Sequence, residues 1–346
     1  MAYSRFEDGD ILINSEKVST PIWSNNSDTL LGSALIANNT GSYSSDFYID
    51  VVDISSEDIK TEVQFSISYA DKLGSGSEAY NTDLASYSPS RTIYGQCRSL
   101  VLGDEESTFS FTDGVESENF WAIFVDRARF KESLRTGSLS VVIGASGSSS
   151  EPIIIKDESA LNSVTETRYK DSGRVYYLYG APAEQDTTGK WIKSETGEWT
   201  KGYGFFLPDI GALLLDCKKL YKAVGKEEND IRYSSTGSAT SVSPYQNSET
   251  LLKAIKSFSL KAEETVTSNY VWVRVKNSEF NYSMNPSFIT STGELRQNIM
   301  INSPETYITT VGLYNDNADC LAVAKLSRPL SKSFSKEALI RIKLDY

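Results

Sequence analysis

The chain has 346 residues and contains no histidine. Histidine is the commonest general base in enzymes and the commonest ligand of transition metals. Its absence excludes Ser-His-Asp triads, Cys-His dyads and zinc sites that use histidine. Carboxylates or lysine could still support catalysis, but the range of chemistry is narrow. We therefore predict a protein that is not an enzyme, with no catalytic residue, no cofactor and no metal site.

Cysteine is scarce as well. The three cysteines are Cys97, Cys217 and Cys320, and each lies more than a hundred residues from the next. No CxxC pair is present, and an odd count at such spacing argues against a disulfide framework. We expect all three to be small buried apolar side chains.

Long apolar runs are missing. The longest, such as Phe120–Val125 and Ala212–Leu215, are far too short to cross a bilayer. Met1–Asp10 is polar and acidic and is followed by no apolar segment typical of a signal peptide. We therefore expect a soluble protein that carries no export signal and does not enter a membrane.

Charge is unevenly distributed. The net charge of −12 disfavours general binding to nucleic acid or to anionic membranes. Residues 1–60 carry ten acidic and three basic side chains, whereas residues 320–344 carry six basic side chains and one acidic one. We predict that the basic segment docks on an acidic surface of a neighbouring subunit, with Arg328, Lys332 and Lys336 at the interface. The alternative is a set of ordinary solvated surface charges.

The hydrophobic pattern predicts a mainly β protein with a few short helices, built from β-sandwich or α+β modules. In 61–69, apolar residues alternate with polar ones, which is the two-residue period of a half-buried strand. The last strand has the same period, with Ile340, Ile342 and Leu344 on one face and Arg341 and Lys343 on the other. Further strands are predicted at Leu30–Ala37, Phe47–Val52, Thr108–Phe111, Phe120–Val125, Leu139–Ile143, Pro152–Ile155, Arg174–Tyr179, Tyr203–Leu207, Ala212–Leu215, Val271–Lys276, Thr306–Leu313 and Leu321–Leu326.

Four short helices are expected from their capping residues. One follows Ser90, and one runs from Asp126 through Leu134. A third spans Cys217–Val224 behind Asp216. The fourth follows Ser248 and places Leu251, Leu252, Ile255 and Phe258 on one face.

Polar, turn-rich stretches divide the sequence into four expected segments. Residues 1–46 form a loop-rich, extended N-terminal arm, and residues 47–160 form a β-rich α+β module. Residues 161–246 are a middle β segment. Residues 247–346 form a C-terminal β domain that ends in a strand, and in it the link Tyr314–Asp319 has strong turn composition.

Several other motifs are weak. The loop Gly74–Ser77 resembles a phosphate-binding loop but lacks the lysine and the following Ser or Thr. Glu7–Asp10 and Asp316–Asp319 offer oxygen atoms for calcium without the ligand pattern of an EF-hand. A sugar-binding face around Trp191 and Trp199, or a hydrolase based on paired carboxylates, are further alternatives.

The C-terminal segment carries a resemblance. Tyr307–Asp316, Leu321–Pro329 and Lys336–Tyr346, together with the upstream block Val273–Phe288, resemble the C-terminus of a virion structural protein family of large contractile-tailed bacteriophages, including marine cyanophages. The match covers about a quarter of the chain.

The resemblance implies a structural component of the virion, in the tail or baseplate, that is assembled in the host cytoplasm. Its partners would be other tail, baseplate or neck proteins, and it would be a homo-oligomer or be present in several copies around a symmetric particle. No catalytic residue is implied. The alternative is a tail fibre or fibre-adaptor protein that binds a receptor or a glycan.

Overall fold

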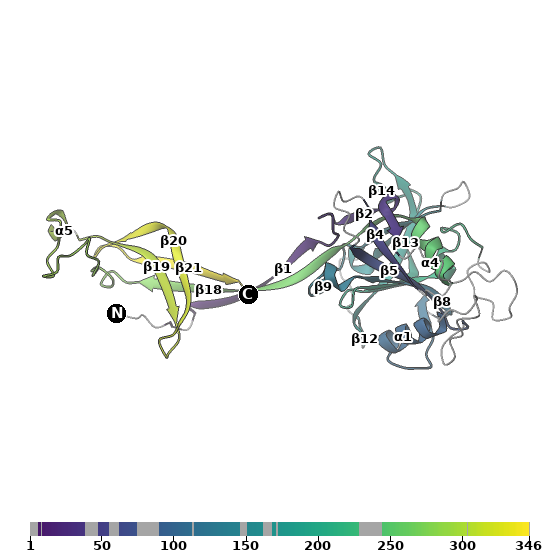
Figure 1. Ribbon diagram of the computed structural model, residues 1–346, viewed down its shortest axis with the longest axis horizontal. Helices are drawn as coiled ribbons and strands as arrows, with labels where there is room; N and C mark the ends of the chain where they lie inside the picture. Colours follow the sequence, from purple (N-terminus) through teal and green to yellow (C-terminus); the bar gives the residue numbers. More distant parts are fainter. Residues whose placement is uncertain are drawn as a thin grey trace. The chain divides into compact units, whose positions relative to one another are not determined.

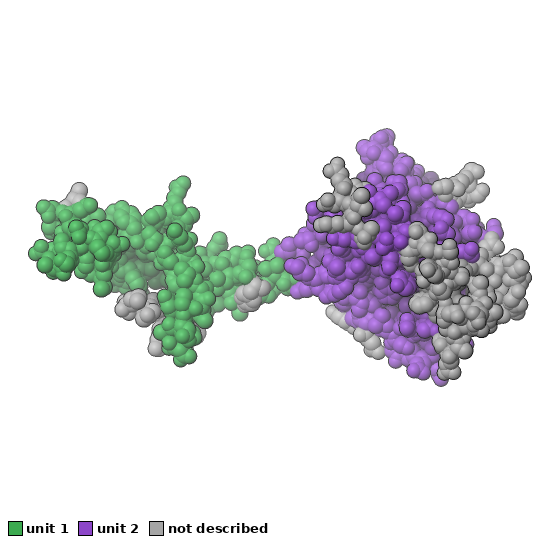
Figure 2. Space-filling view, in the orientation of Figure 1, with its two compact units in different colours: residues 1–17, 265–346 green, residues 18–264 purple. Residues whose placement is uncertain are grey.

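The chain divides into two compact units. The computed structural model describes residues 6–7, 9–38, 48–54, 62–74, 90–112, 114–145, 151–161, 168–170, 172–227, 244–302 and 304–345. Residues 1–17 and 265–346 form one unit, here the terminal unit, and residues 18–264 form the other, the central unit (Figure 2). The terminal unit therefore combines both ends of the sequence, whereas the central unit is one continuous segment.

The fold class predicted from the sequence is confirmed. The structure is 51% strand and 14% helix, with a large, nearly closed antiparallel sheet. This sheet lies in the central unit, and each strand pairs with its neighbour in an antiparallel register. Its order is β2 (Thr29–Leu31), β17 (Ile255–Ser259), β10 (Ser140–Ile143), β11 (Ile153–Asp157), β13 (Gly173–Gln185), β15 (Thr200–Leu207), β16 (Ala212–Asp216), β8 (Asn119–Val125), β5 (Val63–Asp71), β4 (Tyr48–Asp53) and β3 (Leu35–Ala37).

Short elements complete the central unit (Figure 1). Their bounds are β6 (Phe109–Thr112), β7 (Val115–Ser117), β9 (Ser133–Leu134), β12 (Arg168–Lys170), β14 (Trp191–Lys193), α1 (Ser90–Leu102), α2 (Cys217–Leu220), α4 (Pro244–Ala254) and the 3-10 turns η1 (Gly32–Ala34), η2 (Arg127–Arg129) and η3 (Glu158–Ala160). β12 and β14 pair with β13, and β6 pairs with β7.

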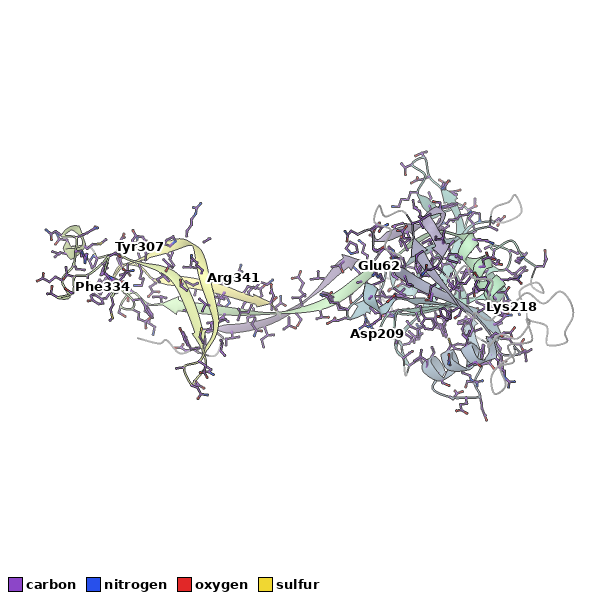
Figure 3. All side chains as sticks on the ribbon, in the orientation of Figure 1. Glu62, Asp209, Lys218, Tyr307, Phe334 and Arg341 are labelled. Atoms are coloured by element: carbon purple, nitrogen blue, oxygen red, sulfur yellow. The ribbon has the colours of Figure 1, made fainter. Side chains whose placement is uncertain are left out.

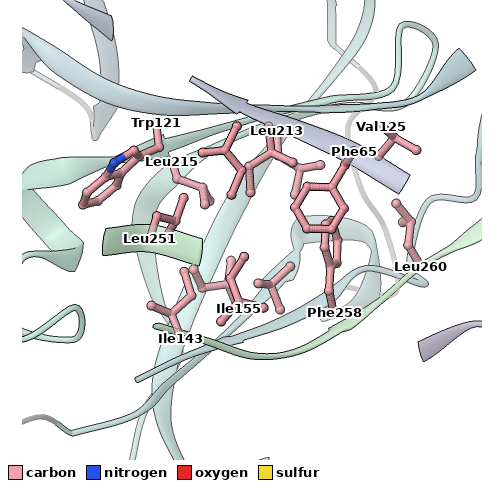
Figure 4. Packing of buried hydrophobic residues seen from close by; sticks show 14 of the residues in the cluster. Phe65, Trp121, Val125, Ile143, Ile155, Leu213, Leu215, Leu251, Phe258 and Leu260 are labelled. Carbon is pink, nitrogen blue, oxygen red and sulfur yellow. The ribbon is translucent and has the colours of Figure 1, made fainter. Parts of the chain in front are cut away.

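One face of the large sheet surrounds the main hydrophobic core. Phe65 and Phe258 meet there edge to face, with ring centroids 5.1 Å apart (Figure 4). Leu213, Leu215 and Ile155 are fully buried in the same cluster. Each such side chain stabilises the fold by about 1.5–3 kcal/mol relative to an exposed position, so this core holds the sheet in its closed form.

The other face of the sheet is covered by α1 and the β6–β7 hairpin. Tyr94 and Cys97 of α1 pack there against Phe109, Phe120 and Phe205. β5 is therefore buried on both faces, although its alternating sequence predicted burial on one. Its polar positions are accommodated by hydrogen bonds. Gln64 donates to Ser24 Oγ (2.8 Å) and to the Glu62 carbonyl (2.7 Å).

The predicted N-terminal arm is corrected in its described part. Ile22, Trp23, Leu30 and Leu35 are buried in the main core. The Trp23 ring lies 5.2 Å from that of Phe258 and 6.1 Å from that of Phe65, by ring centroids. Turn-forming residues surround these apolar positions, so the composition of the segment did not predict their burial. Residues 39–47 of this segment lie outside the described residues.

The predicted boundaries at residues 160 and 246 are also wrong. β8 pairs with β16, and β10 pairs with both β11 and β17. Residues 47–160, 161–246 and 247–264 thus share one sheet, because strands far apart in sequence supply each other's hydrogen bonds. Residues 146–150 and 228–243 lie outside the described residues.

Two of the four predicted helices are correct in place, with altered lengths, and two are changed. α1 lies where it was predicted, with Ser90 as its first residue and not as its cap, and Asp216 Oδ1 accepts from Lys218 N at the start of the short α2. Asp126 caps only a 3-10 turn, because Phe130 is extended. α4 ends at Ala254, and Ile255 and Phe258 lie instead on β17, between β10 and β2.

Candidate interaction surface

Two small sheets contain the strands of the terminal unit. One is formed by β1 (Ile11–Pro21), β18 (Lys261–Val275) and β21 (Ala338–Asp345), and the first residues of β18, which belong to the central unit, also pair with β9. The other is formed by β19 (Thr306–Tyr314) and β20 (Cys320–Lys332) (Figure 1). A four-residue helix, α5, spans Ile299–Asn302. The predicted turn joins β19 to β20, and Asn315 N donates to the Asp319 carbonyl (3.0 Å).

The core of the terminal unit is thin. Its buried members are Val271, Leu313, Ile340 and Ile342, which come from β18, β19 and β21. Around them lie side chains that are only partly buried: Val273, Ile308, Val311, Ala322, Ala324, Leu326 and Leu344. The alternation predicted for β21 is confirmed, because Ile340 and Ile342 face this core while Arg341 and Lys343 are exposed.

The outer face of the β19–β20 hairpin is apolar at the end nearest the turn. Ala322, Ala324 and Leu326 pack against the core, so Val323 and Lys325 between them face outward, and Val323 is 64% exposed. The register shifts beside Leu321, because Leu313 pairs with Ala322 but Tyr314 pairs with Cys320, and Leu321 is left 70% exposed. β20 is thus apolar on both faces here, which is typical of a strand that is covered on both sides.

Tyr314 extends this apolar area. Gly312 pairs with Val323, and a Cβ atom at Gly312 would lie 2.7 Å from Cε2 of Tyr314. The tyrosine ring therefore covers the glycine and leaves no space for another side chain there. We call Thr310, Gly312, Tyr314, Leu321, Val323 and Lys325 the ribbon face.

Other large apolar side chains of the terminal unit are exposed as well. Ile11, Leu12 and Ile13 are consecutive on β1 and are 48%, 58% and 65% exposed, so both faces of that strand are uncovered in the single chain. Tyr307 and Phe334, labelled in Figure 3, are 57% and 61% exposed. Large exposed apolar areas of this kind mark interaction sites.

The two units differ in net charge. The terminal unit carries eleven acidic and eleven basic side chains, so the net charge of −12 belongs to the central unit. A neutral unit experiences no net repulsion from a second copy of itself. The electrostatic obstacle to self-association is therefore small in the terminal unit and large in the central one.

Lys332 is not the exposed docking residue that the sequence suggested. Its side chain is fully buried, and Nζ donates to the Asn277 carbonyl (3.0 Å), Asn281 Oδ1 (2.8 Å) and the Ser333 carbonyl (2.9 Å). An ammonium group has three donors, and here each has a partner. Lys332 therefore fixes the end of β20 to the segment after β18.

The other two predicted interface residues are accessible. Arg328 is exposed on β20. Lys336 pairs with Glu305 (Nζ to Oε1, 3.3 Å) and approaches Ser331 Oγ at the same distance. An exposed pair of this kind contributes less than about 1 kcal/mol and can be exchanged for a partner's carboxylate. The predicted docking of the basic segment remains a prediction that rests on Arg328 and Lys336.

Arg341 forms a feature that the sequence did not indicate. Its guanidinium carbon lies 5.6 Å from the ring centroid of Tyr270 and 5.8 Å from that of Trp272. Trp272 pairs directly with Arg341 across β18 and β21. The outer face of this sheet is therefore aromatic and cationic, unlike the ribbon face.

The cysteines differ from one another. Cys97 and Cys217 are buried, as predicted, and burial raises the pKa of the Cys97 thiol to about 12. Cys320 is exposed at the start of β20, which corrects the expectation for that residue. It lies at the turn end of the hairpin, where the core of the terminal unit does not reach.

The weaker motifs acquire no support as ligand sites. Gly74–Ser77 and Glu7–Asp10 both include residues outside the described part of the chain. Asp319 serves the β19–β20 turn, where its Oδ2 accepts from Asn315 Nδ2 (3.0 Å). Within the described ranges, no cluster of three or more Cys, Asp or Glu side chains is suited to a metal ion, and no helix is long and apolar enough to cross a membrane.

Trp191 and Trp199 lie together on the central unit. Both are partly buried against the small cluster of Val142, Ile154 and Ala181. Lys156 Nζ lies 5.9 Å from the Trp199 ring centroid. These rings fill a packing position at the β13–β14 hairpin and keep part of their surface accessible.

Comparison with known proteins gives no match: no protein-family model, no curated protein and no solved structure corresponds to the chain.

Proposed function

We propose that this chain is a non-enzymatic structural component of a phage virion, in the tail or baseplate, that acts through contacts with other subunits. The observation that carries the proposal is the exposed apolar surface of the terminal unit, where β20 is apolar on both faces. A subunit with such a surface is completed by its neighbours in an assembly.

The resemblance of the C-terminal residues to the phage family is the second support. The residues that carry it, Tyr307–Asp316, Leu321–Pro329 and Lys336–Tyr346, belong to the terminal unit and include β19, β21 and much of β20. The resemblance and the exposed surface therefore occur in the same part of the chain.

The test is mass spectrometry of purified particles from the phage that encodes the chain, followed by a cryo-EM reconstruction of the tail. The proposal requires peptides from both units in the particle fraction, and density for the chain in the tail or baseplate. Particles that contain none of these peptides would exclude it.

A second test addresses the basic segment. Replacing Arg328 and Lys336 with serine leaves the buried Lys332 in place, so the fold is retained. Incorporation into particles should fall, and the difference from the unaltered chain should be largest at low ionic strength, because salt screens the contacts that Arg328 and Lys336 make. Incorporation equal to that of the unaltered chain at all salt concentrations would remove this segment from the interface.

A glycan-binding role for a tail fibre or fibre adaptor is the second candidate. The observation that favours it is the pair of partly exposed rings of Trp191 and Trp199, because sugar rings stack on such surfaces. A glycan array probed with the full chain tests it. Binding that disappears with Trp199→Ala would support this candidate, and an array without binding would exclude it.

A further inference from the structure

We propose that the ribbon face of the terminal unit binds the same face of a second copy of this chain, about a two-fold axis. The inference rests on the proposed function, because it identifies one of the contacts of an assembly protein. It concerns the ribbon face alone and names the occupant of that face.

The first step is the composition of the face. Leu321 and Val323 are exposed by 70% and 64%, and the Tyr314 ring covers the backbone at Gly312 beside them. The opposite side of the same hairpin already contacts β18 and β21 through the thin core. A second sheet on the ribbon face would bury these side chains as sheets bury one another in a β-sandwich.

The second step is the order of charges along β20. Asp316 and Asp319 lie in the turn at one end of the apolar area, and Lys325 lies at the other end, paired with Thr310. Lys325 and Asp319 are six residues apart, which is about 20 Å along a strand. They are therefore too far apart to pair within one copy.

The third step is the symmetry. A two-fold axis through the ribbon face at the level of Ala322 places Val323 of one copy against Leu321 of the other. The same operation brings the long side chain of Lys325 of each copy towards Asp319 of the other, and the register shift beside Leu321 shortens the strand by about one residue between them. The surface is thus complementary to itself in both apolar and charged groups, as a two-fold contact requires. The neutral charge of the terminal unit allows this approach.

The apolar part of the contact is tested by sedimentation velocity of the full chain at tens of micromolar. The unaltered chain sediments as a dimer or larger assembly, and Leu321→Lys with Val323→Lys weakens association by about a hundredfold. Leu339→Lys is the matched control, because Leu339 is 62% exposed on β21, on the other sheet. Equal weakening by the control, or a monomeric unaltered chain, would overturn the proposal.

The charged part is tested by mixing two variants. Lys325→Glu alone places two acidic groups together at both ends of the contact, and Asp319→Lys alone places two lysines together and also removes the acceptor of Asn315 Nδ2 in the turn. Each variant should associate about tenfold or more weakly at low salt. An equimolar mixture restores association, because both ends of the mixed dimer then join opposite charges. Circular dichroism of each variant confirms that the fold is retained.

The mixing result separates this inference from the proposed function. A mixture that associates as weakly as either variant alone would exclude the two-fold contact, whether or not the chain is found in particles. Restored association in the mixture would establish the contact even if the particle fraction lacked the chain. The proposed function is therefore tested by the content of the particles, and the two-fold contact is tested by association in the mixture of variants.

Discussion

Single side chains decide how the thin terminal unit holds together. Lys332 carries a positive charge into a fully buried position, and its partners are two carbonyl groups and the side-chain amide oxygen of Asn281, with no carboxylate among them. Hydrogen bonds to a charged group contribute about 1.5–3 kcal/mol each when buried. The lysine is tolerated because all three of its donors are used.

Lys332→Met keeps the length of the side chain and removes the ammonium group. The acceptors of the buried Asn281 and Ser333 then lose this donor, whereas the Asn277 carbonyl keeps the hydrogen bond from Asn281 Nδ2 (2.6 Å), and we expect the free energy of unfolding of the terminal unit to fall by about 2–4 kcal/mol. Hydrogen exchange of the full chain should show lost protection in peptides that cover residues 276–281 and 331–336. Lys343→Met, at an exposed position, is the control and should leave exchange unchanged; equal exchange in both variants would show that the buried network is not stabilising.

Asp157 gives the central unit a pH dependence. Its side chain is buried, and Oδ2 accepts from Gly137 N (2.7 Å) and from Ser159 Oγ. Burial raises the pKa of Asp157 above its ordinary value of 3.8, because the hydrogen bonds only partly offset the loss of solvent. The folded protein thus holds this proton more tightly than the unfolded chain does.

The free energy of unfolding should therefore fall as the pH rises from 3.8 through the raised pKa of Asp157. Asp157→Asn cannot ionise, so its stability relative to the unaltered chain should increase over that window and then become constant. Urea unfolding at a series of pH values measures the difference. Asp104→Asn is the contrasting variant, because hydrogen bonds from Ser107 lower the pKa of the exposed Asp104. The stability of Asp104→Asn relative to the unaltered chain should therefore decrease, not increase, as the pH rises. A flat difference for Asp157→Asn would contradict the prediction.

At the scale of the element, β15 depends on a bulge made by glycine. The register with β13 shifts between Leu178, which pairs with Gly204, and Tyr179, which pairs with Lys201. Gly204 has φ +143°, and a Cβ atom there would lie 1.8 Å from the carbonyl oxygen of Leu214 on β16. The close approach of β15 and β16 therefore requires the absence of a side chain.

Gly204→Ala should force β15 and β16 apart and lower the free energy of unfolding of the central unit by about 2–3 kcal/mol. Gly95→Ala is the matched control, because Gly95 lies in α1 and, apart from its chain neighbours and the adjacent backbone of the helix, no atom is within 4 Å of the added Cβ position. That change should stabilise the helix by about 0.5–1 kcal/mol. Thermal denaturation should show a lower stability for Gly204→Ala and a higher stability for Gly95→Ala. Destabilisation by Gly95→Ala would contradict this account of the two sites.

Elements with local signals were predictable from the sequence, and those set by distant partners were not. The alternation of Ile340 and Ile342 with charged residues fixed the faces of β21, and turn residues located the β19–β20 link. Ile255 and Phe258 fit a helical face equally well, and only their pairing with β10 and β2 places them on a strand. Lys332 was misread for the same reason, since Asn277 and Asn281 lie more than fifty residues away. The ribbon face did leave a signal, because Leu321 and Val323 alternate with two alanines that are also apolar.

At the scale of the whole molecule, the two units differ both in the size of their hydrophobic cores and in their net charge. The central unit has the large cores and the whole net charge of −12, and the terminal unit has a thin core, no net charge and much exposed apolar surface. A strongly charged unit resists association with its own kind, and a neutral apolar one favours it. Assembly contacts between copies are therefore expected in the terminal unit alone.

Expression of residues 18–264 as a separate fragment tests this division. The fragment is continuous and contains both large cores, including Trp23, Trp121 and Phe258, so it should fold cooperatively and keep the near-ultraviolet circular dichroism of buried aromatic residues. It should remain monomeric in sedimentation at concentrations where the full chain associates, at low and at high salt. The unaltered full chain and the Leu321→Lys, Val323→Lys variant are the two references. A folded fragment that associates as strongly as the full chain would place the contact in the central unit, and would show that its net charge does not govern assembly.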